Sequence, residues 1–238
     1  MSHGLQFQLS YTFSKDLATD LASTTGANGG NGLVGDQTNF LRRYGPDNFN
    51  RPHRFVASYL YQLPGPQNLS SAWGRLAGGW AVSGVSIFQS GHQLSITTSS
   101  PFNAFGMAQD FAQLAAGCTQ TVTAGSLEQN LNNYFNKSCF TSLPKIGPDP
   151  FTTGFGNSSV GMVRGPGQIN TDLAIIKKIA VRWPVEAANV EFRTEFFNVF
   201  NHPQFADPDT SFSSATFGKI QTTAINPRVM QFALKYSF

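Results

Sequence analysis

The last nine residues, Met230-Gln-Phe-Ala-Leu-Lys-Tyr-Ser-Phe238, alternate between two kinds of side chain. Every second residue from Met230 is apolar or aromatic, and the residues between them are polar or small. Because successive side chains of a β-strand point to opposite faces, this period of two predicts a strand with one apolar face. Nine or ten residues is also about the length with which a tilted strand crosses a bilayer.

The same alternation returns at the other end of the chain and, less regularly, between the ends. Residues 5–13 alternate Leu, Phe, Leu, Tyr and Phe with Gln, Ser and Thr. Four further strands are predicted, at 53–63, at 78–98 with a bend at Ser90-Gly91, at 170–180 and at 189–200. The facing of the segment 170–180 is ambiguous because Ile176 interrupts its alternation.

Three charged residues, Glu191, Arg193 and Glu195, occupy alternate positions of the strand predicted at 189–200. Such charges suit a water-filled lumen, where they can pair across strands, and they would be costly on a lipid-facing surface. We interpret them as lumen-facing residues. Salt bridges that stiffen the wall and a part in a permeation path are the two roles considered, and the first is favoured.

The composition agrees with strands that cross a membrane. Charged residues make up 12% of the 238 residues and aromatic residues 13%, whereas a soluble domain carries roughly 25% charged residues. The mean hydropathy is −0.18, and we find no apolar run near the roughly 20 residues that a membrane helix needs. Low charge with many aromatic residues and no helical span is expected of a transmembrane barrel, although composition alone leaves a soluble all-β domain open.

The connections between the predicted strands alternate in length. Segments 15–52, 99–169 and 201–227 are long, and segments 64–77 and 181–188 are shorter. Because outer-membrane barrels have long extracellular loops and short periplasmic turns, both chain termini are predicted to be periplasmic. The long loops are expected to carry little regular structure, and the glycine-rich segment 26–32 reads as a flexible spacer.

Two cysteines, Cys118 and Cys139, lie in one of the long loops. Their spacing is neither zinc-like nor that of a redox motif. A loop disulfide in an oxidising compartment is the preferred interpretation, and two free thiols are the alternative.

Four segments, taken together, carry a resemblance to a known family. These segments are Tyr44-Gly-Pro-Asp-Asn-Phe-Asn-Arg-Pro-His-Arg-Phe-Val-Ala-Ser-Tyr59; Gly78-Gly-Trp-Ala-Val-Ser-Gly84 with Gln89-Ser-Gly91; Arg164-Gly-Pro-Gly167 with Asp172-Leu173; and Phe192-Arg-Thr-Glu-Phe-Phe-Asn-Val-Phe-Asn-His-Pro-Gln-Phe205 with Phe217-Gly-Lys219. With them the chain resembles the C-terminal barrel region of the Oar-like TonB-dependent outer-membrane receptors of acidobacterial type, and the segments follow the family's order along nearly the whole chain.

The resemblance implies a 22-stranded barrel with an N-terminal plug domain, energised by the TonB complex of the inner membrane. The sequence predicts an all-β fold with only six antiparallel transmembrane strands, and its N-terminus lacks a signal peptide. We therefore expect residues 1–238 to be the C-terminal part of a receptor, without the plug domain and the N-terminal strands. Contact with the TonB complex would run only through the missing part, and the transported ligand cannot be read from the sequence.

A last strand that ends in phenylalanine resembles the signal that the barrel-assembly machinery reads in outer-membrane proteins. The machinery and outer-membrane lipid are accordingly the expected partners. The residues of this signal are Met230, Phe232, Leu234, Tyr236 and Phe238.

Other functions find less support. No catalytic motif of the GxSxG or HExxH type occurs, so no catalytic, cofactor or metal residue is assigned and the chain is not expected to be an enzyme. His53 and His202 are interpreted as turn or girdle residues, and Asp207 with Asp209 as a weak calcium candidate without EF-hand spacing. The net charge of +3 without a basic run argues against nucleic acid as a partner.

Two other classes of protein remain open. A structural or adhesive outer-membrane barrel without active transport would share the strand pattern. A soluble carbohydrate-binding sandwich would need polar outer faces, whereas the strands at 5–13 and 230–238 have unbroken apolar faces that would aggregate in water.

Overall fold

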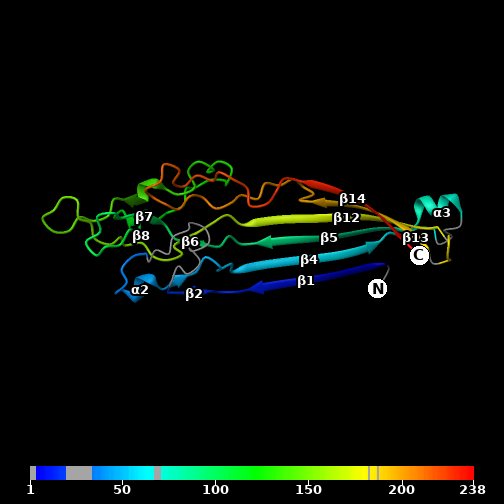
Figure 1. Cartoon of the computed structure of the whole chain (residues 1–238), viewed down its shortest axis with the longest axis horizontal. Helices are drawn as coiled ribbons and strands as arrows, with labels where there is room; N and C mark the ends of the chain where they lie inside the picture. Colours follow the sequence, from blue (N-terminus) through cyan, green and yellow to red (C-terminus); the bar gives the residue numbers. More distant parts are fainter. Residues whose placement is uncertain (1–3, 20–33, 67–70, 182, 187) are drawn as a thin grey trace.

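Six long strands form one antiparallel sheet in which each strand pairs with its neighbour along the chain (Figure 1). The computed structural model describes residues 4–19, 34–66, 71–181, 183–186 and 188–238, so the glycine-rich segment 26–32, interpreted as a flexible spacer, lies outside the described residues. The all-β antiparallel fold is confirmed, and each predicted segment overlaps one strand of this sheet. The strands are β1 (Leu5–Phe13), β4 (His53–Gln62), β5 (Trp80–Gln89), β12 (Gln168–Ala180), β13 (Asn189–Phe197) and β14 (Val229–Ser237).

The prediction of one bent strand over residues 78–98 is wrong, because β5 ends at Gln89 and the chain continues in two short strands of other sheets. The chain leaves the sheet at Ser90-Gly91, where the bend was expected. The Ser90 hydroxyl accepts a hydrogen bond from the His53 N–H at 2.9 Å. A Cβ atom on Gly91 would lie 1.8 Å from the carbonyl oxygen of Gly165, so any side chain at this position would clash with backbone.

The pairing register places the apolar alternate residues of all six strands on one face, which we call the aromatic face. For example, Phe7 lies opposite Tyr59, and Phe192 lies opposite Leu234. The other face, which we call the polar face, carries the intervening residues, which are mostly polar or charged on the outer strands and include the aliphatic Val56, Leu60, Val85 and Ile87 of β4 and β5. A one-residue slip in any pairing would exchange the two faces of a strand, so the shared register is a strong feature of the fold. Members of the aromatic face include Phe7, Tyr59, Val82, Ile175, Phe192 and Phe232, and members of the polar face include Gln8, Ser58, Ser83, Ala174, Glu195 and Gln231.

The register also resolves the facing of β12. Leu173, Ile175, Lys177 and Ile179 lie on the aromatic face, and Ile176 lies on the polar face opposite Arg193. Ile176 therefore adds an apolar side chain to the polar face, and it does not shift the alternation. The consequence for Lys177 is that its side chain starts from the aromatic face.

The long connections form a packed unit at one end of the sheet, and the two chain termini lie at the other end (Figure 1). We call residues 91–167 and 201–227 the loop domain. Its segments pair as short two-stranded sheets, and a 3-10 helix, η1 (Lys137–Cys139), precedes β10. The sheets are β6 (Gln93–Leu94) with β11 (Val163–Arg164), β7 (Thr97–Ser99) with β8 (Gln109–Phe111), and β9 (Gln113–Leu114) with β10 (Phe140–Thr141).

A hydrophobic core lies inside the loop domain. Ile96 and Phe135 are fully buried, and the Phe135 ring lies 5.3 Å from the rings of Tyr134 and Phe217. The aromatic face of the sheet, in contrast, is exposed, with Phe232 65% exposed. The loop domain contains only strands of two or three residues and one 3-10 helix, as the expectation of little regular structure stated, but the sequence did not predict its buried core. The remaining loop elements are β2 (Leu17–Ala18), β3 (Gly45–Pro46) and α2 (Phe40–Arg43).

The connection between β4 and β5 contains a short helix, α3 (Ala72–Ala77), at the end of the sheet where the termini lie (Figure 1). The hydroxyl of Ser71 caps its start by accepting a hydrogen bond from the Gly74 N–H at 2.9 Å. Serine is a favoured residue at this position because its oxygen satisfies a backbone donor of the first turn. The helix ends at Gly78, where the chain turns into β5.

Candidate functional site

The three charged residues predicted to face a lumen lie together on the polar face of β13. Arg193 forms an ion pair with Glu195 at 2.7 Å, and Glu191 forms one with Lys178 of β12 at 3.3 Å. Glu191 also lies opposite Lys235 of β14 in the register. The charges thus have neighbours of opposite sign within and across strands, an arrangement that stabilises a solvated wall modestly.

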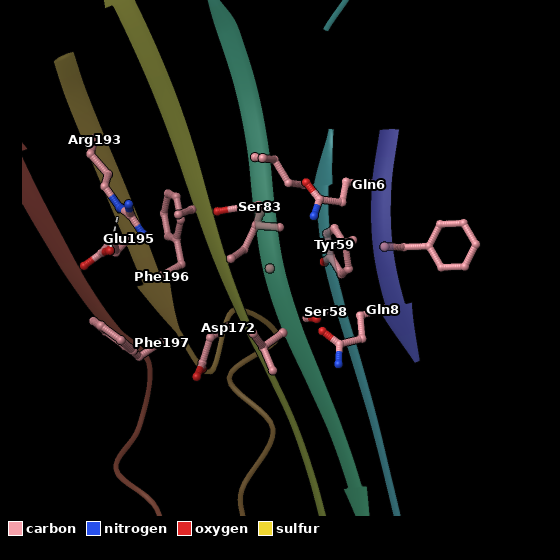
Figure 2. A pocket seen from close by; sticks show the side chains of 16 residues that line it. Gln6, Gln8, Ser58, Tyr59, Ser83, Asp172, Arg193, Glu195, Phe196 and Phe197 are labelled. Carbon is pink, nitrogen blue, oxygen red and sulfur yellow. Dashed lines mark ion pairs between the residues drawn. The ribbon is translucent and has the colours of Figure 1, made fainter. Parts of the chain in front are cut away.

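The polar face borders a hollow with a volume of about 440 Å³. Figure 2 shows the polar side chains that converge on it from neighbouring strands, including Asp172 and Ser83. A carboxylate oxygen of Asp172 accepts hydrogen bonds from the Asn170 side chain at 3.0 Å and from the Asn198 N–H at 2.8 Å. The hollow can therefore contact a polar solute with amide, hydroxyl and carboxylate groups. Its polar-face lining includes Gln6, Gln8, Ser58, Ser83, Asp172 and Glu195.

The two cysteines are joined in the structure by a disulfide within the loop domain. Cys139 is buried in the hydrophobic core and Cys118 packs against it. We expect alkylation of the denatured protein to label neither thiol before reduction and both thiols after it, as read by the mass of the peptides. Labelling of both thiols without a reductant would exclude the bond.

A buried carboxylate, Asp110, holds the strand β8 to a neighbouring segment of the loop domain. Its two oxygens accept hydrogen bonds from the backbone N–H of Phe111 at 2.7 Å and of Gly156 at 3.0 Å. Burial raises the pKa of Asp110 because it disfavours the charged form, and the two hydrogen bonds oppose this shift. Sequence patterns did not reveal this residue, since one of its partners, the Gly156 N–H, lies 46 residues away along the chain.

The raised pKa of Asp110 predicts how the stability of the loop domain changes with pH. A carboxyl with a raised folded-state pKa contributes stability below its unfolded pKa, and this contribution is lost as the pH rises through the folded pKa. We expect the destabilisation by Asp110→Asn to be largest in acid and to shrink as the pH rises, measured by hydrogen exchange at several pH values.

Asp149 provides the matched control for this pH dependence. Hydrogen bonds from Phe151 and Thr152 lower the pKa of this exposed carboxyl, so its stabilising contribution is lost as the pH falls. The effect of Asp149→Asn should therefore depend on pH with the opposite sign. An effect of Asp110→Asn that does not vary with pH would contradict the argument.

The two acidic residues considered for calcium are engaged by protein groups. Asp207 pairs with His92 at 2.9 Å, and Asp209 accepts hydrogen bonds from Ser211 and Thr216. Within the described ranges, no group of three or more histidine, cysteine, aspartate or glutamate side chains could hold a metal ion. The contact of Asp207 with His92 joins segments more than 100 residues apart, which spacing in the sequence could not indicate.

The two histidines singled out from the sequence lie at the loop-domain end of the sheet. His53 begins β4 and forms a hydrogen bond with the Tyr11 hydroxyl at 2.8 Å. The Phe13 ring lies 5.4 Å from that of His53. His202 lies in the turn after β13, where its N–H donates to the side chain of Asn198. The position of His202 agrees with the turn interpretation, and a place of His53 in an aromatic girdle stays a prediction.

The residues of the expected assembly signal lie on the edge strand β14 and just after it. Met230, Phe232, Leu234 and Tyr236 share the aromatic face, and Phe238 is 81% exposed. The Phe232 ring stacks on Phe192 of β13 at 6.3 Å. Among the described residues, no strand pairs with the outer edge of β14 or of β1.

Sequence reasoning missed one charged residue of the sheet, Lys177. This residue is 6% exposed although it belongs to the aromatic face. Its amino group donates to the carbonyl oxygens of Leu76 at 2.9 Å and of Gly78, and it lies 4.9 Å from the centre of the Trp80 ring. The sequence indicated its facing only through its spacing, since Lys177 follows Leu173 and Ile175 at intervals of two residues along the strand.

The sheet is an antiparallel meander with one aromatic face and one polar and charged face, and its long connections lie at one end. These features define the class of transmembrane β-barrel proteins. In the part of the chain that the structure describes, no helix is long and apolar enough to span a bilayer. The family model of the outer membrane beta barrel domain matches residues 1–231, and the chain belongs to this family. No curated protein and no solved structure matched the chain.

Proposed function

We propose that this chain is the C-terminal part of a TonB-dependent receptor that takes up a ligand across the outer membrane, and that it has no enzymatic activity. In this proposal the aromatic face contacts lipid and the polar face lines the lumen. The loop domain lies outside the cell, and both ends of the chain lie in the periplasm.

The observation that carries the proposal is the register of the six strands. Each of the five strand pairings places apolar residues opposite one another on this face, for example Phe55 opposite Phe88 and Phe196 opposite Met230, while serine, threonine, glycine, histidine or lysine occupies some of the other positions. The aromatic face therefore extends from β1 to β14. A face of this kind is unfavourable in water and favourable in the bilayer. The ion pairs of Glu191 and Arg193 lie on the opposite, polar face, which suits a wet lumen.

The open edges of the sheet support a larger barrel. The smallest ordinary barrels have about eight strands, and each unsatisfied backbone group in lipid costs several kcal/mol. Further strands that pair with β1 and β14 would remove this cost. The TonB complex would then act through a plug domain in the N-terminal part of the same protein, and the assembly machinery would bind the strand that ends near Phe238.

The test is to read the gene upstream of the codon for Met1. An in-frame extension that encodes a signal peptide, a plug domain, a TonB-contact segment and further strands would support the receptor. A stop codon close upstream, with translation starting at Met1, would overturn the transport proposal. With the second outcome, the chain would be either a short barrel protein, in which several copies of the chain together close one barrel, or the product of a gene remnant.

A second candidate is a structural or adhesive barrel, and an exposed patch on the loop domain favours it. Phe102, Phe105 and Phe151 are each more than 60% exposed, and the rings of Phe102 and Phe151 lie 6.3 Å apart. Exposed apolar patches often mark interaction surfaces. An extended gene without a plug domain and a TonB-contact segment would favour this candidate.

A further inference from the structure

We propose that α3 is a lipid-binding anchor, which lies in the headgroup region of the membrane leaflet at the end of the sheet where the chain termini lie. The inference goes beyond ligand uptake. It rests on one element of the proposed function, the contact of the aromatic face with lipid.

The first observation is the position of α3 on the aromatic side of the sheet. Lys177 starts from the aromatic face, and its amino group donates to the carbonyl oxygens of Leu76 and Gly78 at the end of α3. The indole N–H of Trp80, also on the aromatic face, donates to the same Leu76 oxygen at 3.0 Å. The end of α3 is thus held against the lipid side of the wall and away from the polar face.

The second observation is the surface that α3 presents. Trp73 is 69% exposed and Leu76 is 65% exposed, and residues three apart are neighbours on a helix surface. This exposed apolar pair continues the aromatic face beyond the end of the strands. An apolar surface continuous with a lipid-facing wall matches the acyl chains and glycerol region of a phospholipid.

The third observation is the distribution of tryptophan. The chain has three tryptophans, and all three lie at this end of the sheet: Trp73 in α3, Trp80 at the start of β5, and Trp183 in the turn after β12. Tryptophan is enriched at membrane–water interfaces because its ring is apolar and its N–H is polar. The indole N–H of Trp80 is already satisfied by the Leu76 carbonyl, while the Trp73 and Trp183 side chains are exposed.

Lys177 is a positioning residue in this proposal. An ammonium group on a lipid-facing surface is unfavourable unless partners satisfy it. Here two carbonyl oxygens at the C-terminus of α3 accept its hydrogen bonds, and the negative end of the helix dipole favours the positive charge. The charge that would be costly in lipid therefore fixes the anchor to the wall.

The experiment measures the fluorescence of the full chain in phosphatidylcholine vesicles whose acyl chains are brominated either close to the headgroup or near their ends. The contribution of Trp73 is the difference between the native chain and its Trp73→Phe variant. We expect bromine close to the headgroup to remove most of this emission, bromine near the chain ends to remove less, and iodide in the water to have little effect.

Two lysine variants test the positioning role. In Lys177→Met the amino group is lost and the aliphatic stem is kept, so α3 should loosen and Trp73 should become less quenched by lipid and more quenched by iodide. Lys178→Met is the matched control, because Lys178 is the next residue, lies on the polar face and pairs with Glu191. Equal Trp73 quenching in both variants would overturn the role of Lys177.

A third variant separates this inference from the proposed function. Phe232→Trp places a probe in the middle of β14 on the aromatic face. If this probe is quenched by brominated lipid while Trp73 is quenched only by iodide, the sheet is in the membrane and the anchor is refuted. If the probe is not quenched either, the lipid contact of the aromatic face fails, and the anchor fails with it.

Discussion

Replacing Phe135 with alanine is expected to destabilise the loop domain by about 3–5 kcal/mol, the usual cost of removing a buried phenylalanine side chain. Phe135 is fully buried and contacts the rings of Tyr134 and Phe217. Its segment is also joined to the segment around Phe217 by backbone hydrogen bonds, for example from the Tyr134 N–H to the Gly218 oxygen at 2.8 Å. The cavity left by alanine would therefore loosen two segments that are distant in the sequence.

Hydrogen exchange read at the level of peptides measures this effect, because it reports local stability separately for the loop domain and for the sheet. Protection should fall in the segments around residues 134 and 218 and should stay unchanged in β4 and β5. The matched control is Phe102→Ala, which removes the same side chain from an exposed position of the same domain. A loss of protection in the sheet, or equal effects of the two variants, would show that the loop domain has no core of its own.

The strands of the sheet could be predicted because the alternation of apolar and polar residues within each strand reflects the two surfaces that the strand separates. A strand between an apolar and a polar surface repeats its pattern every two residues, and this local signal located β1 at Leu5–Phe13 and β14 within one residue. The C-terminal end of β13 was predicted less accurately, since the strand stops at Phe197 and Asn198 adopts a positive φ of 52°. Asparagine tolerates this conformation better than most residues, so the sequence contained the signal although the apolar pattern ran on to residue 200.

The core of the loop domain could not be predicted from local pattern. Ile96, Phe135 and Phe217 come from three distant segments, and the segments around Phe135 and Phe217 have no period of two or of 3.6 residues. Turn-forming glycine, asparagine and proline residues between them are typical of irregular loops. Only the pairing of segments in space shows that the apolar residues form one cluster.

The contacts of the candidate site were predicted only in part for the same reason. The phase of Glu191, Arg193 and Glu195 on one strand placed them on a common face, as the register shows. The partner of Glu191 on the next strand, Lys178, depends on the register between strands, which a single strand does not specify. The contact of Lys177 with α3 joins residues about 100 positions apart, so no spacing rule could indicate it.

Replacing Phe232 with lysine is expected to lower the unfolding free energy of the membrane-bound chain by about 2–4 kcal/mol, the cost of a lysine on the lipid face near the bilayer midplane. Phe232 lies near the middle of β14, on the aromatic face, and its ring stacks on Phe192. The measurement is a denaturant titration of the chain folded in phospholipid vesicles. Unfolding from vesicles is preferable to assembly in cells, because Phe232 also belongs to the expected assembly signal.

Gln231→Lys is the matched control, since it adds the same charge one residue earlier on the same strand. Gln231 lies on the polar face opposite Glu195, so a lysine there gains a neighbour of opposite charge and stays hydrated if the polar face lines a lumen. We expect its effect to be within about 1 kcal/mol of zero, the usual size for an exposed pair. A similar decrease of the unfolding free energy in the two variants would mean that both faces are in contact with lipid or that neither is. A larger destabilisation by Gln231→Lys than by Phe232→Lys would mean that the polar face, and not the aromatic face, contacts the membrane.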